Sequence, residues 1–420
     1  MHAAGIQNAV LENSFEAKAD FLALLAVQLH ETGTTAARLE NALDNVGHKL
    51  GLDADVWSSP TAIILSLTVN LRSHSVAPQN WVRVLRLTPG DINLRTLCAV
   101  DDIAERVISG ELNAQSGARA LTLASAPVAP ARFWLETLLG FTLASAGVAA
   151  LLRAAWIEIL LAATIGAVLG LLHLTLGVRR RFASGLDALC AIVAAFLVTS
   201  AAHFFAVDYR RALLASVIVL IPGLSITSAA AEIATQHLVS GTARMAGALA
   251  TLLKLAFGAL VGAEAAKLLG MTALVSVPHP TPEWVAWTGL LVSATSFAVL
   301  FKALLKDYPL AIGAAILGYA STRIGGDLYG AEFGVFFAGL IVALAANTYA
   351  RHSRRPGAII RLPGIILLVP GSVGFKSLFF VFQKDVFLGL DTAISMLLLV
   401  ISLVAGLLLA STLIAPRHSL

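Results

Sequence analysis

The chain has 420 residues, of which 58% are hydrophobic and only 13% are charged, and its mean hydropathy is +0.83. A soluble domain carries about 25% charged residues, so a water-exposed surface cannot be built from so few charges, and the excess apolar residues are expected to face lipid. The formal net charge of +4 is spread over many loops, which argues against nucleic-acid binding.

Residues 1–130 have the composition of an ordinary soluble α/β domain. Met1 to Asp20 lacks the continuous apolar stretch of a secretion signal, so this domain is expected to stay in the cytoplasm. Phe15 to Leu50 has helical spacing with a break near Glu31-Thr32-Gly33, and the second helix should carry Arg38 and Glu40 on its solvent side.

Two strands and a further helix complete the expected domain. Ala62–Val69 is rich in β-branched residues and Leu, and Trp81–Leu87 alternates apolar and basic residues, so both are predicted strands. Asp91 or Asn93 should begin a helix that runs to about Ser109. Residues 122–132, rich in Ala and Pro, are the expected linker into the membrane.

About ten transmembrane helices are predicted after this domain, from stretches of continuous apolar sequence. They lie at about 133–151, 155–176, 188–206, 211–230, 243–267, 284–301, 309–321, 331–350, 359–380 and 392–415. With the N-terminus inside, the basic clusters at 179–181 and 351–361 fall in the cytoplasm, as the positive-inside rule requires, and Arg210-Arg211 is the pair against it.

The membrane part carries an internal repeat. Pro222-Gly223 recurs as Pro370-Gly371, 148 residues later, and Gly241 and Gly258 recur at the same offset. Each half, residues 131–270 and 280–420, then holds five spans. Because five is odd, the second half is inverted relative to the first, an arrangement that secondary transporters commonly use, with the substrate site where the halves meet.

The two Pro-Gly pairs lie about eleven residues into their spans, near mid-depth. Proline removes a backbone donor, and such a break survives in a bilayer only when it is buried in protein or lines a wet cavity. A half-helix that begins there directs its first amides at an anion such as a carboxylate. The predicted substrate-binding residues are therefore the two breaks and the polar residues that follow them, Pro222, Gly223, Ser225, Thr227, Ser228, Pro370, Gly371, Ser372 and Lys376.

Ionisable residues inside spans are costly and are candidates for proton coupling. Glu232, nine residues after the first Pro-Gly pair, is the first candidate, and Lys254 and Glu136 are the others. We find no metal-ligand cluster, phosphate loop or nucleophile motif, so no metal, cofactor or enzymatic activity is expected, and the absence of an ATP-binding signature argues against primary active transport.

Nearly the whole chain resembles the threonine/serine exporter family (ThrE type), and this chain resembles the fused form of a family also known as two polypeptides. The soluble motifs are Glu31-Thr32-Gly33, Arg38-Leu39-Glu40, Leu50-Gly51, Arg83-Val84 and Asp91-Ile92-Asn93-Leu94. The membrane motifs are Ile221-Pro222-Gly223-Leu224-Ser225-Ile226-Thr227, Ser240-Gly241, Leu362-Pro363-Gly364 and Val369-Pro370-Gly371-Ser372. Near Glu232 the family often has an aspartate.

The resemblance implies a multi-pass protein of the bacterial cytoplasmic (inner) membrane that exports threonine or serine by proton antiport. The partners are then a small amino acid, protons and the bilayer, and formation of a homo-oligomer stays open. One alternative is an exporter of another small carboxylate or a dipeptide. Another is a membrane-anchored enzyme or sensor, in which Arg83, Arg86 and His30-Glu31 of the N-terminal domain would bind a small acidic ligand.

Overall fold

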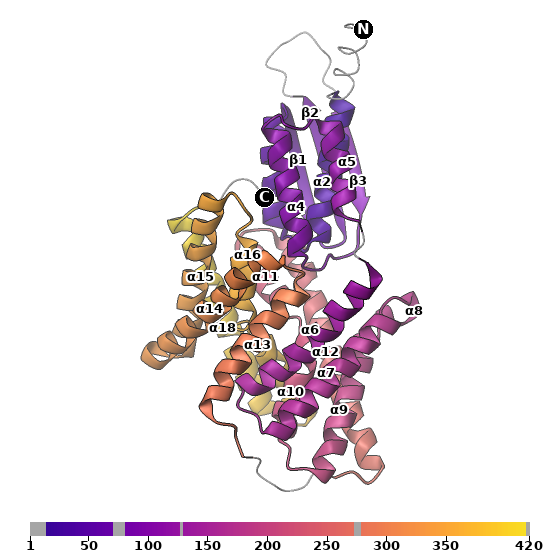
Figure 1. Cartoon of the computed structure of the whole chain (residues 1–420), viewed down its shortest axis with the longest axis vertical. Coiled ribbons are helices and arrows are strands. Elements are labelled where there is room, and N and C mark those ends of the chain that lie inside the picture. Colours follow the sequence, from indigo (N-terminus) through magenta and orange to yellow (C-terminus); the bar gives the residue numbers. More distant parts are fainter. Residues whose placement is uncertain (1–13, 70–79, 127–128, 273–278, 417–420) are drawn as a thin grey trace.

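The computed structural model describes residues 14–69, 80–126, 129–272 and 279–416, and it divides into an N-terminal unit and a bundle of long helices (Figure 1). In the N-terminal unit (residues 14–126) an antiparallel sheet of order β1-β2-β3 packs against four helices. Its elements are α2 (Phe15–Glu31), α3 (Ala36–Lys49), β1 (Leu52–Ser59), β2 (Ala62–Val69), β3 (Asn80–Arg86), α4 (Leu94–Ile108) and α5 (Ala114–Ala124).

One face of this sheet is buried because its side chains alternate. Ile63, Leu65 and Leu67 of β2 are fully buried, and they pack in one core with Leu22 and Leu25 of α2. The predicted strand at 62–69 has the same bounds as β2, and the predicted strand at 81–87 is offset by one residue from β3. The strand β1 was not predicted from the sequence.

The bundle continues the chain below the N-terminal unit. Its first set of elements is α6 (Pro130–Leu151), α7 (Trp156–Leu176), α8 (Arg180–Ala183), α9 (Leu186–Phe204), α10 (Tyr209–Val217), η1 (Ile218–Leu220), α11 (Gly223–Ala234) and α12 (Leu238–Leu268). Its second set is α13 (Glu283–Leu300), η2 (Leu305–Asp307), α14 (Tyr308–Tyr329), α15 (Ala331–Ser353), α16 (Ala358–Ile366), α17 (Gly371–Phe382) and α18 (Val386–Leu413).

Among the described residues, eight spans are long and apolar enough to cross a membrane: α6, α7, α9, α12, α13, α15, α16 with α17, and α18. The pair α10-η1 and α11, bent by 61° at its break, would make a ninth. The predicted seventh span falls on α14, which has 22 residues but carries Arg323 and Asp327 in its last turns and is not among the eight. The chain is thus a mostly helical, multi-pass membrane protein.

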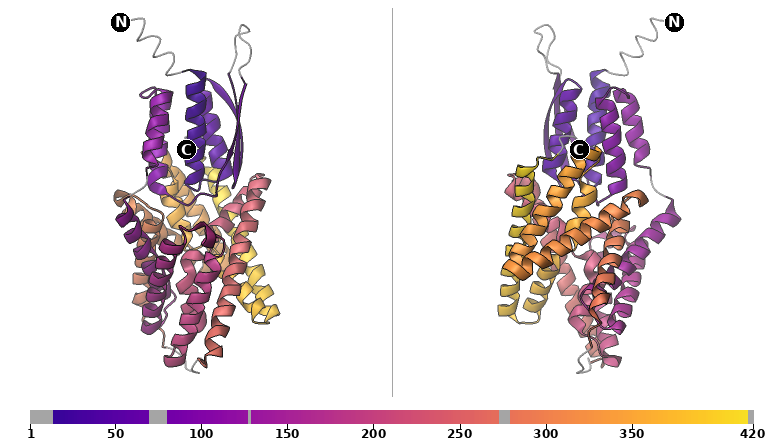
Figure 2. Two further views of the ribbon diagram at one scale, coloured as in Figure 1. Left: turned by 90° about the vertical axis from the view of Figure 1, so that its right-hand side faces the viewer. Right: turned by 60° about the vertical axis from the view of Figure 1, so that its left-hand side comes forward.

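The N-terminal unit sits on one end of the bundle, and both views in Figure 2 show it above the ends of the membrane helices. Backbone bonds join the two parts, since the Leu94 amide donates to the Phe301 carbonyl at 2.9 Å and the Arg95 amide donates to the Lys302 carbonyl at 3.2 Å. The Arg95 guanidinium also pairs with Glu136 at 3.2 Å. These contacts hold the start of α4 against the bundle.

Candidate functional site

The two Pro-Gly breaks meet inside the bundle. Pro222 and Pro370 are the N-cap residues of α11 and α17, so each half-helix begins directly after its proline. A Cβ added at Gly371 would lie only 2.7 Å from the Gly223 Cα, and one added at Gly223 would lie 2.5 Å from Val369. Any larger residue would therefore force the two half-helices apart.

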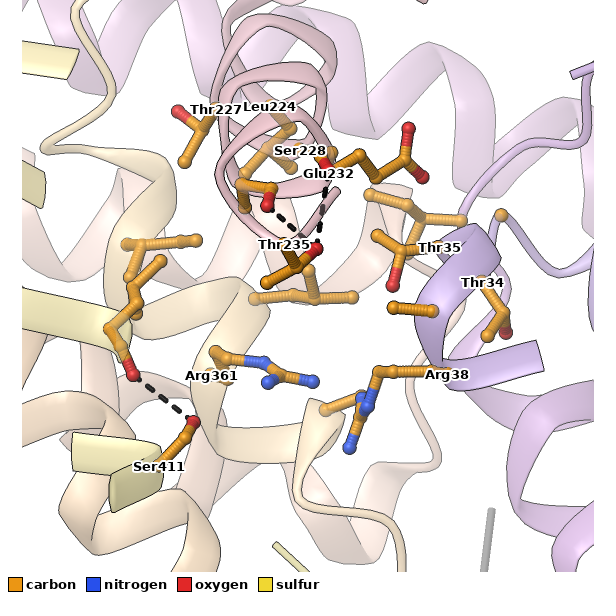
Figure 3. A pocket seen from close by; sticks show the side chains of 18 of the residues that line it. Thr34, Thr35, Arg38, Leu224, Thr227, Ser228, Glu232, Thr235, Arg361 and Ser411 are labelled. Carbon is orange, nitrogen blue, oxygen red and sulfur yellow. Dashed lines mark hydrogen bonds between the residues drawn. The ribbon is translucent and has the colours of Figure 1, made fainter. Parts of the chain in front are cut away.

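A cavity of about 200 Å³ lies beside α11, at the end of the bundle that faces the N-terminal unit. Its walls come from the α2–α3 loop and the start of α3, from α11, from α16 and from the end of α18 (Figure 3). Residues far apart in the sequence, such as Thr35 and Arg361, thus share one cavity. At about 30 Å³ per water this volume corresponds to roughly seven water molecules, which suits a small solute.

Two arginines from different parts of the chain face this cavity. Arg38 comes from α3 and Arg361 from α16, and their guanidinium groups approach one another from opposite walls (Figure 3). Among the residues that the structure describes, neither guanidinium makes a hydrogen bond or ion pair, and the charge of Arg38 repels Arg361. Burial lowers the pKa of Arg38, and the nearby charge of Asp101 only partly opposes that effect. Two such cations in a partly dry cavity favour an anion.

Glu232 is 1% exposed and ties α11 to its surroundings. Its carboxylate accepts hydrogen bonds from the Ala36 amide at 3.0 Å, from the Ser240 hydroxyl at 3.0 Å and from two nitrogens of Arg244 at 3.2 Å each. The residue therefore lines the cavity while its carboxylate joins the membrane bundle to the first amide of α3.

A second acid–base contact lies next to this one. His237, just before α12, pairs with Glu40 of α3 at 3.2 Å, and the Ser58 amide donates to the other Glu40 oxygen at 2.8 Å. Burial raises the pKa of Glu40, while the Ser58 amide and His237 act in the opposite direction. The start of α3 is thus held to the bundle by two carboxylates.

Hydroxyl groups complete the cavity wall. Thr34, Thr35, Thr227 and Ser228 all line it. Thr227 is 3% exposed, and its hydroxyl has no hydrogen-bond partner among the described residues. A buried hydroxyl without a partner costs roughly 1–3 kcal/mol, so a polar ligand that bonded it would recover that cost.

The structure gathers some of the predicted site residues and separates others. Thr227, Ser228 and Glu232 line the cavity. Ser225 and Ser372 stand in the first turns after the two breaks but are not part of its wall. Lys376 lines a different cavity at the far end of the bundle.

The two remaining proton-coupling candidates lie outside the cavity. Lys254 pairs with Asp187 at 3.0 Å, between α12 and α9. Glu136 pairs with Arg132 at 2.7 Å and with Arg95, where α6 meets the N-terminal unit. Each is therefore bound to a partner away from the breaks.

The sequence analysis missed the two arginines of the cavity. It placed Arg38 on the solvent side of its helix, but that side packs towards α11 and α16, and it grouped Arg361 with basic loop residues. The available signal was a lone arginine inside the apolar run before Pro363, together with the Arg38-Leu39-Glu40 motif. Within the described residues, no group of three His, Cys, Asp or Glu side chains could hold a metal ion.

Corresponding glycines of the two halves make corresponding contacts. A Cβ at Gly241 would lie 2.9 Å from the Ala229 carbonyl oxygen, and one at Gly389 would lie 3.1 Å from that of Ser377, 148 residues after Ala229. The same holds for a second pair of glycines. A Cβ at Gly258 would lie 2.5 Å from the Ala188 carbonyl oxygen, and one at Gly406 would lie 2.3 Å from that of Phe336, 148 residues after Ala188.

Comparisons with known proteins agree on one family. A threonine/serine exporter model matches residues 20–266, and a second, described as "Threonine/Serine exporter, ThrE", matches residues 287–413. The "Probable threonine/serine exporter" of Mycobacterium tuberculosis is 23% identical over 86% of this chain and 69% of its own length.

Fungal proteins are similar as well. The "Pheromone-regulated membrane protein 10" of Eremothecium gossypii is 23% identical over 82% of this chain, and that of Zygosaccharomyces rouxii is 22% identical over the same share. The matched part is 47% and 35% of their lengths, so this chain spans less than half of either. No solved structure gives a significant match to the chain.

Proposed function

Because the chain belongs to the threonine/serine exporter family, we propose that it is a secondary transporter that moves threonine or serine out of the cytoplasm. The observation that carries the proposal is a pair of arginines, Arg38 and Arg361, in a small cavity beside a broken helix. Among the described residues, neither guanidinium is hydrogen-bonded to a carboxylate. A substrate carboxylate would neutralise both charges, and charge-assisted bonds of this kind are strong in a partly dry site.

The other walls of the cavity match the remaining groups of such a substrate. The unpartnered Thr227 hydroxyl and Ser228 offer bonds to a substrate hydroxyl. Glu232 lies in the same wall, with its carboxylate shared with Arg244. An amino acid without a hydroxyl would leave the Thr227 hydroxyl unsatisfied, and selectivity for threonine or serine follows from that difference.

Residues 131–270 and 280–420 are, in this proposal, two inverted copies of one five-helix unit. The matched glycine contacts at an offset of 148 residues support the repeat, and so does the reciprocal contact of Gly223 with Gly371. Such a pair of units supplies two related conformations, one open to each side of the membrane, with the substrate near the junction of the breaks.

The N-terminal unit is the gate on the cytoplasmic side. Its α2–α3 loop lines the cavity, so the substrate passes this loop on its way in. A cytoplasmic position agrees with the positive-inside rule, which places the basic clusters at 179–181 and 351–355 on that side.

Proton coupling is assigned to Glu232. A proton on this carboxylate would remove the charge that pairs with Arg244 and weaken the bond from the Ala36 amide. Protonation would thereby loosen α3 from α11 and open the cytoplasmic gate, while the ionised form would hold it closed.

The test is efflux from cells of a bacterium that lacks its own threonine exporters. Cells that express this chain are loaded with labelled threonine, serine, alanine, succinate or a dipeptide, and loss of label is compared with cells that carry an empty vector. We expect rapid efflux of threonine or serine that stops with a protonophore. Efflux of none of these solutes overturns the proposal, and efflux of succinate or dipeptide alone assigns the cavity to that substrate instead.

A further inference from the structure

A second cavity, of about 230 Å³, lies at the end of the bundle away from the N-terminal unit. It opens between α10 and α17, next to the end of α6. The residues that line it are Leu152, Arg210, Arg211, Leu213, Leu214, Phe375, Lys376, Phe379 and Phe380.

This cavity corresponds position by position to the cavity beside α11. Its α17 wall is made of Phe375, Lys376, Phe379 and Phe380, each of which lies 148 residues after an α11 residue of the first cavity. Those α11 residues are Thr227, Ser228, Ala231 and Glu232. On the opposite walls, Leu213 and Leu214 likewise correspond to Arg361 and Leu362. The two cavities are therefore the same place in the two halves of the bundle.

The chemistry of the second cavity is basic and aromatic. Arg211 is compensated by Asp208 at 2.9 Å, but the Arg210 side chain stacks over Phe380, 5.0 Å from the ring centre, and Lys376 is exposed. Among the described residues, no acidic side chain lines this cavity or pairs with the Arg210 or Lys376 side chain. The cavity thus attracts a carboxylate, and it offers an ammonium group aromatic faces but no carboxylate.

The junction of the breaks joins the starts of α11 and α17, the two half-helices that line the two cavities. Gly223 and Gly371 touch there, with Ile221 2.8 Å from a Cβ at Gly371 and Val369 2.5 Å from a Cβ at Gly223. A solute that passed between the two glycines would leave the first cavity and enter the second. Both cavities contain basic side chains, but only the first also contains a carboxylate, that of Glu232.

We propose that the second cavity is the exit site of the transporter, where Lys376 and Arg210 bind the carboxylate of the departing amino acid before its release. This inference rests on the proposed export function. The absence of an acidic wall makes the exit site weaker than the first cavity, because it holds one charged end of the zwitterion and repels the other.

The exit site can be tested from the outside in cells, where every molecule has one orientation. Cells are loaded with labelled threonine, and unlabelled external threonine is added to accelerate efflux by exchange. We expect Lys376→Met with Arg210→Gln to raise the half-maximal external concentration about fivefold or more, as loss of exposed charges predicts. The half-maximal internal threonine concentration should stay as in the wild type. The conservative variant Lys376→Arg, which keeps the positive charge, should keep the half-maximal external threonine concentration of the wild type.

The control is Lys267→Gln, an exposed lysine near the same end of the bundle that lies outside the cavity. If the wild type moves no threonine, the export function itself fails. The exit site is wrong, and the export function stands, in two cases. In the first, the wild type exports threonine and the double variant has the same half-maximal external threonine concentration. In the second, the double variant raises the half-maximal external and internal concentrations equally.

Discussion

The two broken helices of the bundle share a Pro-Gly pair and differ in almost everything that follows it. The first, α10-η1 with α11, bends by 61°, whereas α16 and α17 together pass as one span. After the break, α11 presents Thr227, Ser228 and Glu232, while α17 presents two phenylalanines and Lys376 at the matching positions. The N-terminal unit reaches α11, since the Ala36 amide of α3 donates to Glu232 and the α2–α3 loop lines the cavity beside it.

This difference separates the framework from the chemistry. The close contact at Gly223 and Gly371 belongs to the framework and is shared by both halves. Only the first cavity gathers two arginines and a glutamate, Arg38, Arg361 and Glu232. In the proposed function, this asymmetry would let the substrate bind where it is scarce and leave where it is abundant.

Glu232→Gln tests the selective side most severely. The change leaves Arg244 without its acidic partner, and breaking a buried pair costs roughly 3–5 kcal/mol. We expect export to fall strongly and the remaining export to ignore a protonophore. Export in loaded cells measures both effects, with Glu264→Gln, an exposed glutamate, as the control. Export that stays fully sensitive to the protonophore would remove Glu232 from the coupling.

Arg361→Gln tests the substrate contact itself. Loss of a charge-assisted bond costs about 2–3 kcal/mol, which corresponds to roughly a 30- to 150-fold rise in the half-maximal internal threonine concentration. The control is Arg119→Gln, an exposed arginine of α5 outside the cavity. An unchanged half-maximal concentration in Arg361→Gln would exclude this arginine as the carboxylate partner.

Gly371→Ala tests the shared framework. The added methyl group would lie 2.7 Å from the Gly223 Cα and 2.8 Å from Ile221, and overpacking of this kind costs about 1–3 kcal/mol. We expect a lower Tm in detergent and slower export. Gly313→Ala is the matched control, because nothing lies within 4 Å of a Cβ at that helical glycine. Equal Tm values in the two variants would mean that the half-helices are not in close contact.

Glu40→Gln tests the contact between α3 and the bundle. The change weakens the pairing with His237, and a partly exposed pair contributes at most about 1 kcal/mol. We expect faster hydrogen exchange at residues 32–38, measured by mass spectrometry. Glu111→Gln, which removes an exposed carboxylate that pairs with Arg106 at 3.3 Å, serves as the comparison. Identical exchange in wild type and Glu40→Gln would show that this pair does not hold the gate.

The smallest effect is expected from pH, through His30 next to the same loop. Burial lowers the pKa of His30 below its ordinary 6.5, and its ring nitrogen lies 3.1 Å from the Thr88 carbonyl oxygen. A lowered pKa contributes stability above pH 6.5 that is lost as the pH falls through 6.5 towards the folded-state pKa, by about 1 kcal/mol or less. The Tm at pH 5.5 should lie below that at pH 7.5, and His30→Asn should narrow the gap while His48→Asn should not.

Local sequence was enough to predict eight or nine of the ten expected spans, the breaks and β2, because these follow from hydropathy, from proline chemistry and from β-branched runs. It was not enough for β1, whose Asp53 and Asp55 interrupt the apolar pattern, or for α14, whose last turns carry Arg323 and Asp327. Thr227, Ser228 and Glu232 were predicted because they directly follow a break. Arg38 and Arg361 were not, because their shared cavity depends on a contact between segments more than 300 residues apart, which no periodicity records.

The bond from the Ala36 amide to Glu232 also has a consequence for biosynthesis. Thr35, the N-cap residue of α3, makes no side-chain bond to the helix, and the carboxylate that caps the Ala36 amide lies 196 residues later in the chain. Chains fold from the N-terminus as they are made, so α3 leaves the ribosome long before its cap does. The bond that joins the start of α3 to the bundle can therefore form only after α11 has been synthesised.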